Sequence, residues 1–277
     1  MVRYREIRPP VRLRSFINSF WILEHDGEDD APQRVVPDGQ AELILNWGEP
    51  FQAFQDGRWE GQPRCFLAGQ IDGPLLLRPA GPAKMLGIGF RPHGAACVFR
   101  EPMHELSGCF TPLEDLSQSL SRSLSNAMES PDPIAAVEAA LLSAQGSSRG
   151  VDLLMAQAVR RIIFEKGATD LASLARELGL SIRQLERRFL AVVGLPPKLF
   201  CRIQRFNNVF HVLGQHLEQP SRNWVDTAVA CGYYDQAHLI RDCKSLSGST
   251  PATLLAADAD LARHFYQRYG VSRAGAR

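Results

Sequence analysis

Apolar residues between positions 171 and 178 recur with the spacing of a helix. They fall at i, i+3, i+4 and i+7, which places them on one face of an amphipathic helix. The apolar positions are Leu171, Leu174, Ala175 and Leu178. Asp170 precedes them as a predicted N-cap, and Gly179 follows as the residue expected to end the helix in the left-handed backbone region.

A second helix is predicted directly after this glycine turn, with Ser181 as its cap. Its apolar residues are expected to face inward: Ile182, Leu185 and Phe189. Arg183 and Arg187 point the opposite way at about 100° per residue. Two short helices joined by a glycine turn, with arginines facing outward, are typical of a helix-turn-helix whose recognition helix enters the major groove of DNA. The alternative is a solvated helical face that is rich in arginine.

The same unit occurs again 54 positions further along the chain. The pairs that share this offset are Ser181 with Asp235, Leu185 with Leu239, Arg187 with Arg241, Gly194 with Gly248, and Pro197 with Pro251. Such self-similarity indicates a repeated structural unit. Reading two successive grooves of DNA is the best reason for having two such units in tandem.

The second unit is predicted to have a first helix at Trp224–Ala230, a turn at Cys231-Gly232 and a second helix capped by Asp235. Its inward residues are Leu239, Cys243 and Leu246. Its outward or groove-facing residues are Gln236, Ala237, His238, Arg241 and Lys244. Because an alanine offers only a methyl group, this helix is expected to read fewer bases, or none, and to rely on phosphate contacts.

A linking helix is predicted between the units, opened by Pro196-Pro197 and running from about Lys198 to Gly214. Its inward residues are Phe200, Ile203, Phe206, Val209 and Phe210. Arg202 and Arg205 are expected to be solvated or to face phosphates. A rigid helix here would hold the recognition helices about 34 Å apart, the distance between adjacent major grooves on one face of DNA.

The first 147 residues have a different pattern, with short apolar strands and a turn about every ten residues. This spacing predicts a β sandwich or barrel. Short helices are expected after the strands at 95–99 and 103–106, followed by one from Thr111-Pro112 to about Ser125 and one at 133–142. The fold class is therefore α+β. We predict a β-rich, barrel-like domain with flanking helices at 1–147, an all-α domain with two helix-turn-helix units at 151–257, and a helical extension or tail at 258–277.

Charge separates the two halves. Residues 1–150 carry 14 Lys+Arg and 19 Asp+Glu, a net charge of −5, whereas residues 151–277 carry 17 and 11, a net charge of +6. A basic half joined to an acidic half favours nucleic-acid binding by the basic one. The six cysteines are scattered without zinc-ligand spacing, and no signal peptide or membrane-spanning run is present. A cytoplasmic protein without membrane association is expected.

The carboxyl-terminal half resembles the DNA-binding domain of the AraC/XylS family of bacterial transcription regulators over residues 151 to about 257. The most specific match is the run from Ala228 to Lys244, followed by Gly-Ser-Thr-Pro at 248–251. The resemblance implies sequence-specific contacts to double-stranded DNA from Arg183, Gln184, Arg187, Gln236, His238, Arg241 and Lys244. There are two departures: Glu186, which would accept from cytosine or orient the neighbouring arginines, and Cys243, which replaces the usual Phe and is expected to loosen the second unit.

The amino-terminal half resembles the cupin-like sensor domains of some AraC-family regulators. The resemblance is carried by Phe20-Trp21, by Val-Pro-Asp-Gly at 36–39, and by the run at 87–94. It implies a small-molecule effector or partner, and dimerisation through helices. We expect no cofactor and no metal, because the histidines are far apart. Asp38 is expected to form a turn rather than to act as a catalytic acid. Trp21 and Trp47 are expected to fill the core, with the lining of a pocket as the alternative. Arg91 is expected to pair with an acid such as Glu105 or Glu114, with an anionic effector as the alternative.

The leading hypothesis is therefore a DNA-binding transcription regulator, not an enzyme, whose mechanism is binding. One alternative is a barrel enzyme that binds or transforms a small molecule, with an accessory helical domain. The sequence shows no nucleophile–base set, metal-ligand set or phosphate loop to support it. A third hypothesis is a DNA-binding protein without an effector. Its amino-terminal half would then only form a homodimer or contact RNA polymerase.

Overall fold

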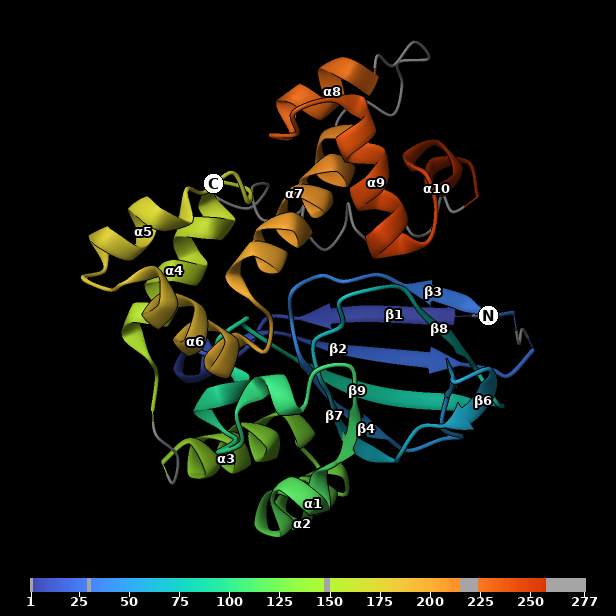
Figure 1. The fold of residues 1–277 in the computed structure, drawn as a ribbon. Helices are drawn as coiled ribbons and strands as arrows, with labels where there is room; N and C mark the ends of the chain where they lie inside the picture. The colour runs from blue at the N-terminus through green and yellow to red at the C-terminus, as the bar shows by residue number, and fades with distance from the viewer. Residues whose placement is uncertain (1, 29–30, 147–149, 215–223, 258–277) are drawn as a thin grey trace, which may run out of the picture.

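The computed structural model describes residues 2–28, 31–146, 150–214 and 224–257. The expected extension at 258–277 lies outside these ranges, as do residues 147–149 at the predicted boundary between the two halves. Strands and short helices make up the amino-terminal half, and helices α4 to α10 make up the other (Figure 1). None of the described helices is long and apolar enough to cross a membrane.

The strands form two antiparallel sheets. One has six strands in the order β1-β2-β9-β4-β7-β10, and the other has four in the order β3-β8-β5-β6. The strands of the first sheet are β1 (Val2–Ile7), β2 (Ile17–His25), β4 (Glu42–Asn46), β7 (Cys65–Ala68), β9 (Ala83–Phe90) and β10 (Phe110–Pro112). Those of the second are β3 (Gln33–Val35), β5 (Gln52–Gln55), β6 (Arg58–Gly61) and β8 (Leu75–Arg78).

Both faces of the six-stranded sheet are buried, because successive residues of a strand point to opposite sides. One face packs against the short helices, and its core includes Phe20, Leu43, Leu45, Ile88 and Phe90. The other face packs against the four-stranded sheet, and its core includes Trp21, Ile44, Phe66, Met85 and Leu77. The expected core position of Trp21 is confirmed. The half therefore has three layers: four-stranded sheet, six-stranded sheet and helices.

The predicted α+β fold is confirmed, and its barrel-like part is refined. Within the described ranges the strands divide between two open sheets, whose edge strands are β1 and β10 in one and β3 and β6 in the other. The short strands and frequent turns predicted a sandwich or a barrel alike. Only the pairing of the strands distinguishes the two.

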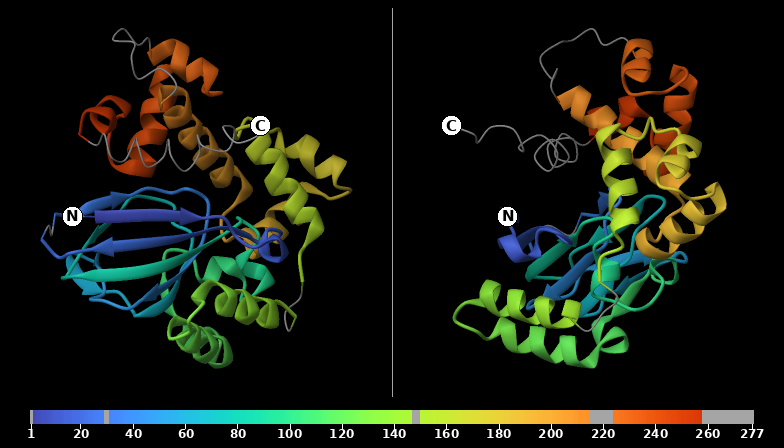
Figure 2. Two further views of the ribbon diagram at one scale, coloured as in Figure 1. Left: turned by 180° about the vertical axis from the view of Figure 1, so that it is seen from behind. Right: turned by 90° about the vertical axis from the view of Figure 1, so that its left-hand side faces the viewer.

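The helices of this half are η1 (Val11–Leu13), η2 (Ala95–Cys97), η3 (Met103–Glu105), α1 (Leu113–Leu116), α2 (Gln118–Met128) and α3 (Pro133–Gly146). Figure 2 shows α2 and α3 side by side at one edge of the molecule. The single helix predicted from Thr111 to about Ser125 was wrong. Residues 110–112 pair with β7 as a strand, and Ser117 interrupts the helix with an extended backbone while its side chain caps α2. Sequence pattern missed the break because the serine lies within an otherwise helical run.

The carboxyl-terminal half is helical, and α7 runs through it as the shared element (Figure 1). Its helices are α4 (Leu153–Phe164), α5 (Leu171–Glu177), α6 (Ile182–Val193), α7 (Pro197–Gly214), α8 (Trp224–Ala230), α9 (Gln236–Ser247) and α10 (Pro251–Ala257). Phe200 of α7 joins the core around α4 to α6, and Phe206 joins the core around α8 to α10. With 18 residues, α7 is about 27 Å long at 1.5 Å per residue.

Candidate nucleic-acid interface

The first helix-turn-helix unit has the caps that its sequence predicts. Asp170 accepts a hydrogen bond from the N–H of Ala172 at 3.1 Å, and Gly179 has a φ of +68° in the turn. A capping box starts α6. The Ser181 hydroxyl accepts from the N–H of Gln184 at 3.3 Å, and the Gln184 amide oxygen accepts from the N–H of Ser181 at 2.8 Å. These bonds fix the start of α6, which is the first predicted recognition helix.

The outer face of α6 is exposed and basic. Arg183 and Arg187 are exposed, and within the described residues neither side chain forms an ion pair or a hydrogen bond. Glu186 is also exposed and pairs with neither arginine there, so it does not orient them. Gln184 lies at the same end, with its amide oxygen held by the cap and its amide nitrogen still able to donate.

The inner face of α6 is anchored by apolar packing and by one ion pair. Leu185 and Phe189 are fully buried, as predicted. The inward prediction for Ile182 was wrong, since this side chain is 40% exposed in the first turn of the helix. Arg188 donates to both carboxylate oxygens of Asp152 at 2.8 and 2.9 Å, which ties α6 to the start of α4. Arg188 is therefore held against the protein, whereas Arg183 and Arg187 on the same helix face outward.

The second unit repeats the cap with a different residue. Gly232 has a φ of +77° in the turn, and the Asp235 carboxylate accepts from the N–H of His238 at 2.6 Å. Leu239, Cys243 and Leu246 are fully buried, as predicted. Arg241 and Lys244 are exposed, and in the described part of the chain neither forms an ion pair or a hydrogen bond. Gln236 lies in the first turn and is partly exposed.

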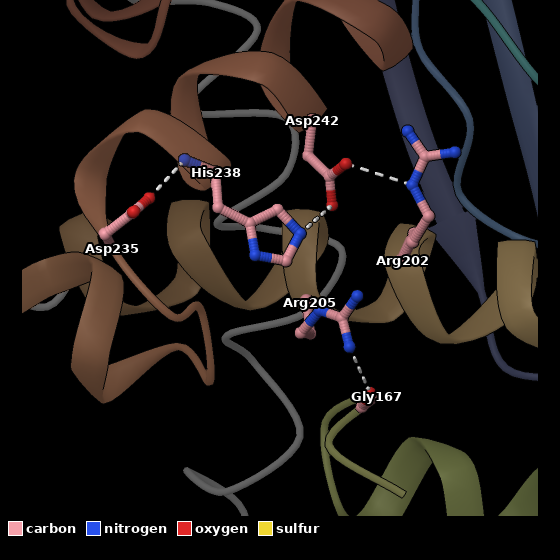
Figure 3. Close-up of polar contacts among 6 residues, drawn as sticks. All are labelled: Gly167, Arg202, Arg205, Asp235, His238 and Asp242. Carbon is pink, nitrogen blue, oxygen red and sulfur yellow. Dashed lines mark hydrogen bonds and ion pairs between the residues drawn. The ribbon is translucent and has the colours of Figure 1, made fainter. Parts of the chain in front are cut away.

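His238 is turned towards the protein rather than straight outward (Figure 3). Its ring meets Tyr233 edge-on, with the centroids 5.2 Å apart, and its Nε2 lies 3.9 Å from Oδ2 of Asp242. Burial, together with the nearby Asp242 carboxylate, raises the pKa of Tyr233 well above its ordinary value, so this phenol stays neutral. His238, which the sequence predicts to contact DNA, therefore lies between the groove-facing end of α9 and a polar cluster beneath this helix.

The centre of this cluster is Asp242, a buried carboxylate on the inner side of α9. Its Oδ1 accepts from Nε of Arg202 on α7 at 2.9 Å. Arg205, one turn further along α7, donates to the carbonyl oxygen of Gly167 at 3.0 Å (Figure 3). Its guanidinium also lies over the Tyr233 ring, 5.6 Å from the ring centroid. The two arginines join α7 to the second unit and to the turn that precedes α5.

The prediction that Arg202 and Arg205 are solvated or face phosphates was therefore wrong. Both hold protein groups, because α7 lies between the two units and has little free surface. A signal for this was present in the sequence. Asp242 lies three residues after Leu239 and four before Leu246, which places an acid on the buried side of α9. An acid in that position needs a cationic partner from a neighbouring helix.

Other predicted positions in the amino-terminal half serve the structure. Asp38 forms the expected turn, accepting from the N–H of Gln40 at 2.9 Å. Arg91 donates to the carbonyl oxygen of Arg14 at 2.6 Å, so the expected partner acid was wrong. Burial and the nearby Arg91 lower the pKa of His93, although its bond to the Ser15 carbonyl opposes this. No group of three or more His, Cys, Asp and Glu side chains in the described ranges is placed to hold a metal ion.

Two family models match the chain, one in each half. Residues 174–257 match a model described as a helix-turn-helix domain, and residues 5–111 match one described as a domain of unknown function, DUF6597. No curated protein matches the chain. The helix-turn-helix match covers both recognition helices and the linking helix between them.

The solved structures that match the chain have low sequence identity to it. A structure of ToxT from Vibrio cholerae has a TM-score of 0.44 at 8% identity, over 92% of this chain and 97% of that one. ToxT bound to (E)-4-(8-methylnaphthalen-1-yl)but-3-enoic acid has a TM-score of 0.45 at 8% identity, over 92% and 98%. The AraC-like transcriptional activator CuxR has a TM-score of 0.29 at 15% identity, over 78% and 87%.

Proposed function

We propose that the chain is a DNA-binding transcription regulator of the AraC type, which reads two successive major-groove segments of its operator with α6 and α9. The observation that carries the proposal is the pair of exposed basic side chains on each of these capped helices. They are Arg183 and Arg187 on α6, and Arg241 and Lys244 on α9. Basic groups without a protein partner are available for phosphates and bases.

The first recognition helix is the main reader of bases in this proposal. Arg183 and Arg187 lie one turn apart, and each guanidinium can pair with guanine O6 and N7. Gln184 contributes through its amide nitrogen, because its oxygen is engaged in the capping box. Glu186, exposed beside them, is placed to accept from the amino group of a cytosine.

The second recognition helix contributes more to affinity than to base reading. Arg241 and Lys244 would contact phosphates, with Gln236 at the entry to the groove. His238 would reach DNA only from the side, because its ring packs against Tyr233 and faces Asp242. Ala237 offers only a methyl group, which can contact a thymine methyl.

The amino-terminal half would bind a small-molecule effector or a partner that alters DNA binding. A cavity of about 370 Å³ lies among α1 to α3 and the turn after η2. This volume is within the range of small-molecule sites. Hydroxyl groups from Ser117, Ser119, Ser123 and Ser143 line it. A metabolite that binds there would raise the melting temperature. Ser143→Leu would fill the cavity and remove that rise, whereas Ser125→Leu on α2 would not.

Three further parts of the proposal follow from the regulatory role. A transcription regulator acts where the chromosome is, so a cytoplasmic location is part of the proposal. Homodimer formation would appear as twice the mass of one chain in light scattering. Contact with RNA polymerase would appear as co-operative binding of both proteins to promoter DNA.

Fluorescence anisotropy with the full chain tests the proposed function. The probes are duplex DNA from upstream of its own gene and a scrambled duplex, at several salt concentrations. We expect tighter binding to the native duplex and a fall in affinity with salt as counterions are released. Arg187→Ala should lose about 1–3 kcal/mol of discrimination between the duplexes. Arg161→Ala on α4 is the matched control. Equal binding to both duplexes, followed by failure of a selection from random sequence, would refute the proposal.

A further inference from the structure

The two recognition helices end in equivalent turns, and both turns rest on the amino-terminal half. Gly194 ends α6 with a φ of +92°, and Gly248 ends α9 with a φ of +72°. These glycines are one of the pairs that share the repeat offset in the sequence. The repeat therefore presents the amino-terminal half with two copies of one structural feature.

The turn after α6 is capped by side chains from the other half. Nε2 of Gln70 donates to the carbonyl oxygen of Val193 at 2.7 Å, and the Ser107 hydroxyl lies 2.8 Å from the carbonyl oxygen of Gly194. The last carbonyls of a helix have no partner within the helix. Gln70 is 3% exposed, so this cap is made inside the junction and not in water.

The turn after α9 is held by a different part of the same half. Nη1 of Arg34 on β3 donates to the Ser249 hydroxyl at 2.5 Å. A Cβ atom placed on Gly248 would lie 3.6 Å from Cγ of Pro74, an ordinary van der Waals distance. The two halves are thus in contact at both turns.

One short segment lies beside both turns, and its Gln70 bonds the first of them. Residues 69–74 join β7 of the six-stranded sheet to β8 of the four-stranded sheet. Gln70 is near one end of this segment and Pro74 is at the other. The segment is braced where it starts, because the N–H of Gly108 donates to the carbonyl oxygen of Gln70 at 2.8 Å, and that of Gly69 donates to the carbonyl oxygen of Cys109 at 3.0 Å.

We infer that residues 69–74, with Ser107 and Arg34, position the two recognition helices relative to each other, so that the amino-terminal half sets the half-site spacing on DNA. This inference rests on the proposed function. The residues act through the ends of α6 and α9 and touch no DNA themselves. One inserted base pair moves a half-site by about 3.4 Å and turns it by about 35°. Two helices that are each held at the carboxyl-terminal turn by the same half cannot follow that change.

The linking helix offers a competing explanation. Since α7 packs into the cores of both units, it would hold a spacing without help from the amino-terminal half. If α7 alone sets the spacing, loss of the contacts at the two turns leaves the spacing preference unchanged. If the contacts contribute, their loss broadens the preference while the recognition helices keep their base contacts.

The experiment measures binding of the full chain to operators that differ only in spacing. The wild type first selects an operator from random duplexes, and duplexes with one base pair removed, or with one or two added, between the half-sites follow. The variants are Gln70→Ala with Ser107→Ala, which removes the cap on α6, and Arg34→Ala, which removes the contact at α9. A third has two glycines inserted between Asp72 and Gly73.

Matched controls keep the same residue types but leave the junction intact. Gln52→Ala alters a glutamine on β5 that bonds Arg78 within its own half, and Ser125→Ala alters a serine within α2. Arg34→Lys keeps a cationic donor at the α9 contact and should restore the wild-type profile. Circular dichroism and thermal melting of each variant establish that it is folded.

We expect the wild type to lose about tenfold in affinity when one base pair is added, because one recognition helix then misses its half-site. In the variants this loss should shrink to about threefold or less, with little change at the original spacing. Spacing profiles of the folded variants that match the wild type would overturn the inference and assign the spacing to α7. Failure of the wild type to select any operator would refute the proposed function, and this inference with it.

Discussion

The two helix-turn-helix units share one sequence pattern but bury different chemistry beneath their recognition helices. Under α6 the core is apolar, with Phe189 against Phe200 at a centroid distance of 5.5 Å, and its ion pair lies near the surface. Under α9 the inner face holds Asp242, 4% exposed and bonded to Arg202. Equivalent caps and turns therefore do not imply equivalent anchoring.

The difference extends to the outer faces. Each unit has two exposed basic side chains on its outer face, but the second also has Ala237 and a histidine that packs against Tyr233. A buried carboxylate must be kept paired, which restrains the neighbouring side chains. The second unit thus uses buried polar groups to orient its helix, whereas the core beneath the helix of the first unit is apolar.

The largest contrast is expected from the two ion pairs. Arg202→Ala leaves the buried Asp242 carboxylate of the second unit without its cationic partner. This change should lower the free energy of unfolding by about 3–5 kcal/mol. Arg188→Ala breaks the half-exposed pair with Asp152 in the first unit and should lower it by only about 0.2–1 kcal/mol. Urea unfolding followed by circular dichroism measures both. Equal losses would mean that the units are anchored alike.

The recognition helices should differ in what an arginine contributes. Arg187→Ala is expected to reduce discrimination between operator and scrambled duplex by about 1–3 kcal/mol. Arg241→Ala at the equivalent position should weaken both duplexes alike and reduce the salt slope by about one. Anisotropy titrations across a range of salt separate these effects. A loss of discrimination in Arg241→Ala as large as in Arg187→Ala would make α9 an equal reader of bases.

The caps should show where the units are the same. Ser181→Ala and Asp235→Ala each remove the side chain that accepts from the start of a recognition helix, and each should cost about 1 kcal/mol. Thermal melting compares them, with Ser125→Ala as a control outside both units. A cap loss that destabilises one unit several times more than the other would show that the repeat is not equivalent even at its turns.

The smallest contrast concerns the buried thiols. Burial raises the pKa of Cys243 to about 12 and that of Cys201 to about 11, so both remain protonated at pH 8, where only a thiolate reacts. Exposed Cys109 should label first with a thiol reagent, and Cys201 and Cys243 should both stay protected. Mass spectrometry of the labelled peptides gives the order. Faster labelling of Cys243 than of Cys201 would indicate that replacing the family's usual Phe has loosened the second unit.

The recognition helices and their caps were predictable because their determinants are local. The spacing of apolar residues, a serine or aspartate at the start and a glycine at the end define a helix within about a dozen positions. This accounts for the success at Ser181, Gly179 and Asp235. The same local reasoning failed at Ile182, in the exposed first turn of α6, and at Ser117, which interrupts a run that otherwise reads as one helix.

The sequence by itself determined the repeat, the α+β division of the chain, the charge asymmetry and the outward basic residues of α6 and α9. Only the tertiary structure decided that the strands form two open sheets, that Arg202 and Arg205 serve the protein, and that His238 leans towards Asp242. It alone joined Gln70 and Ser107 to the end of α6. The physical reason is that periodicity records which face of an element is buried, whereas a partner from a distant segment is chosen by packing.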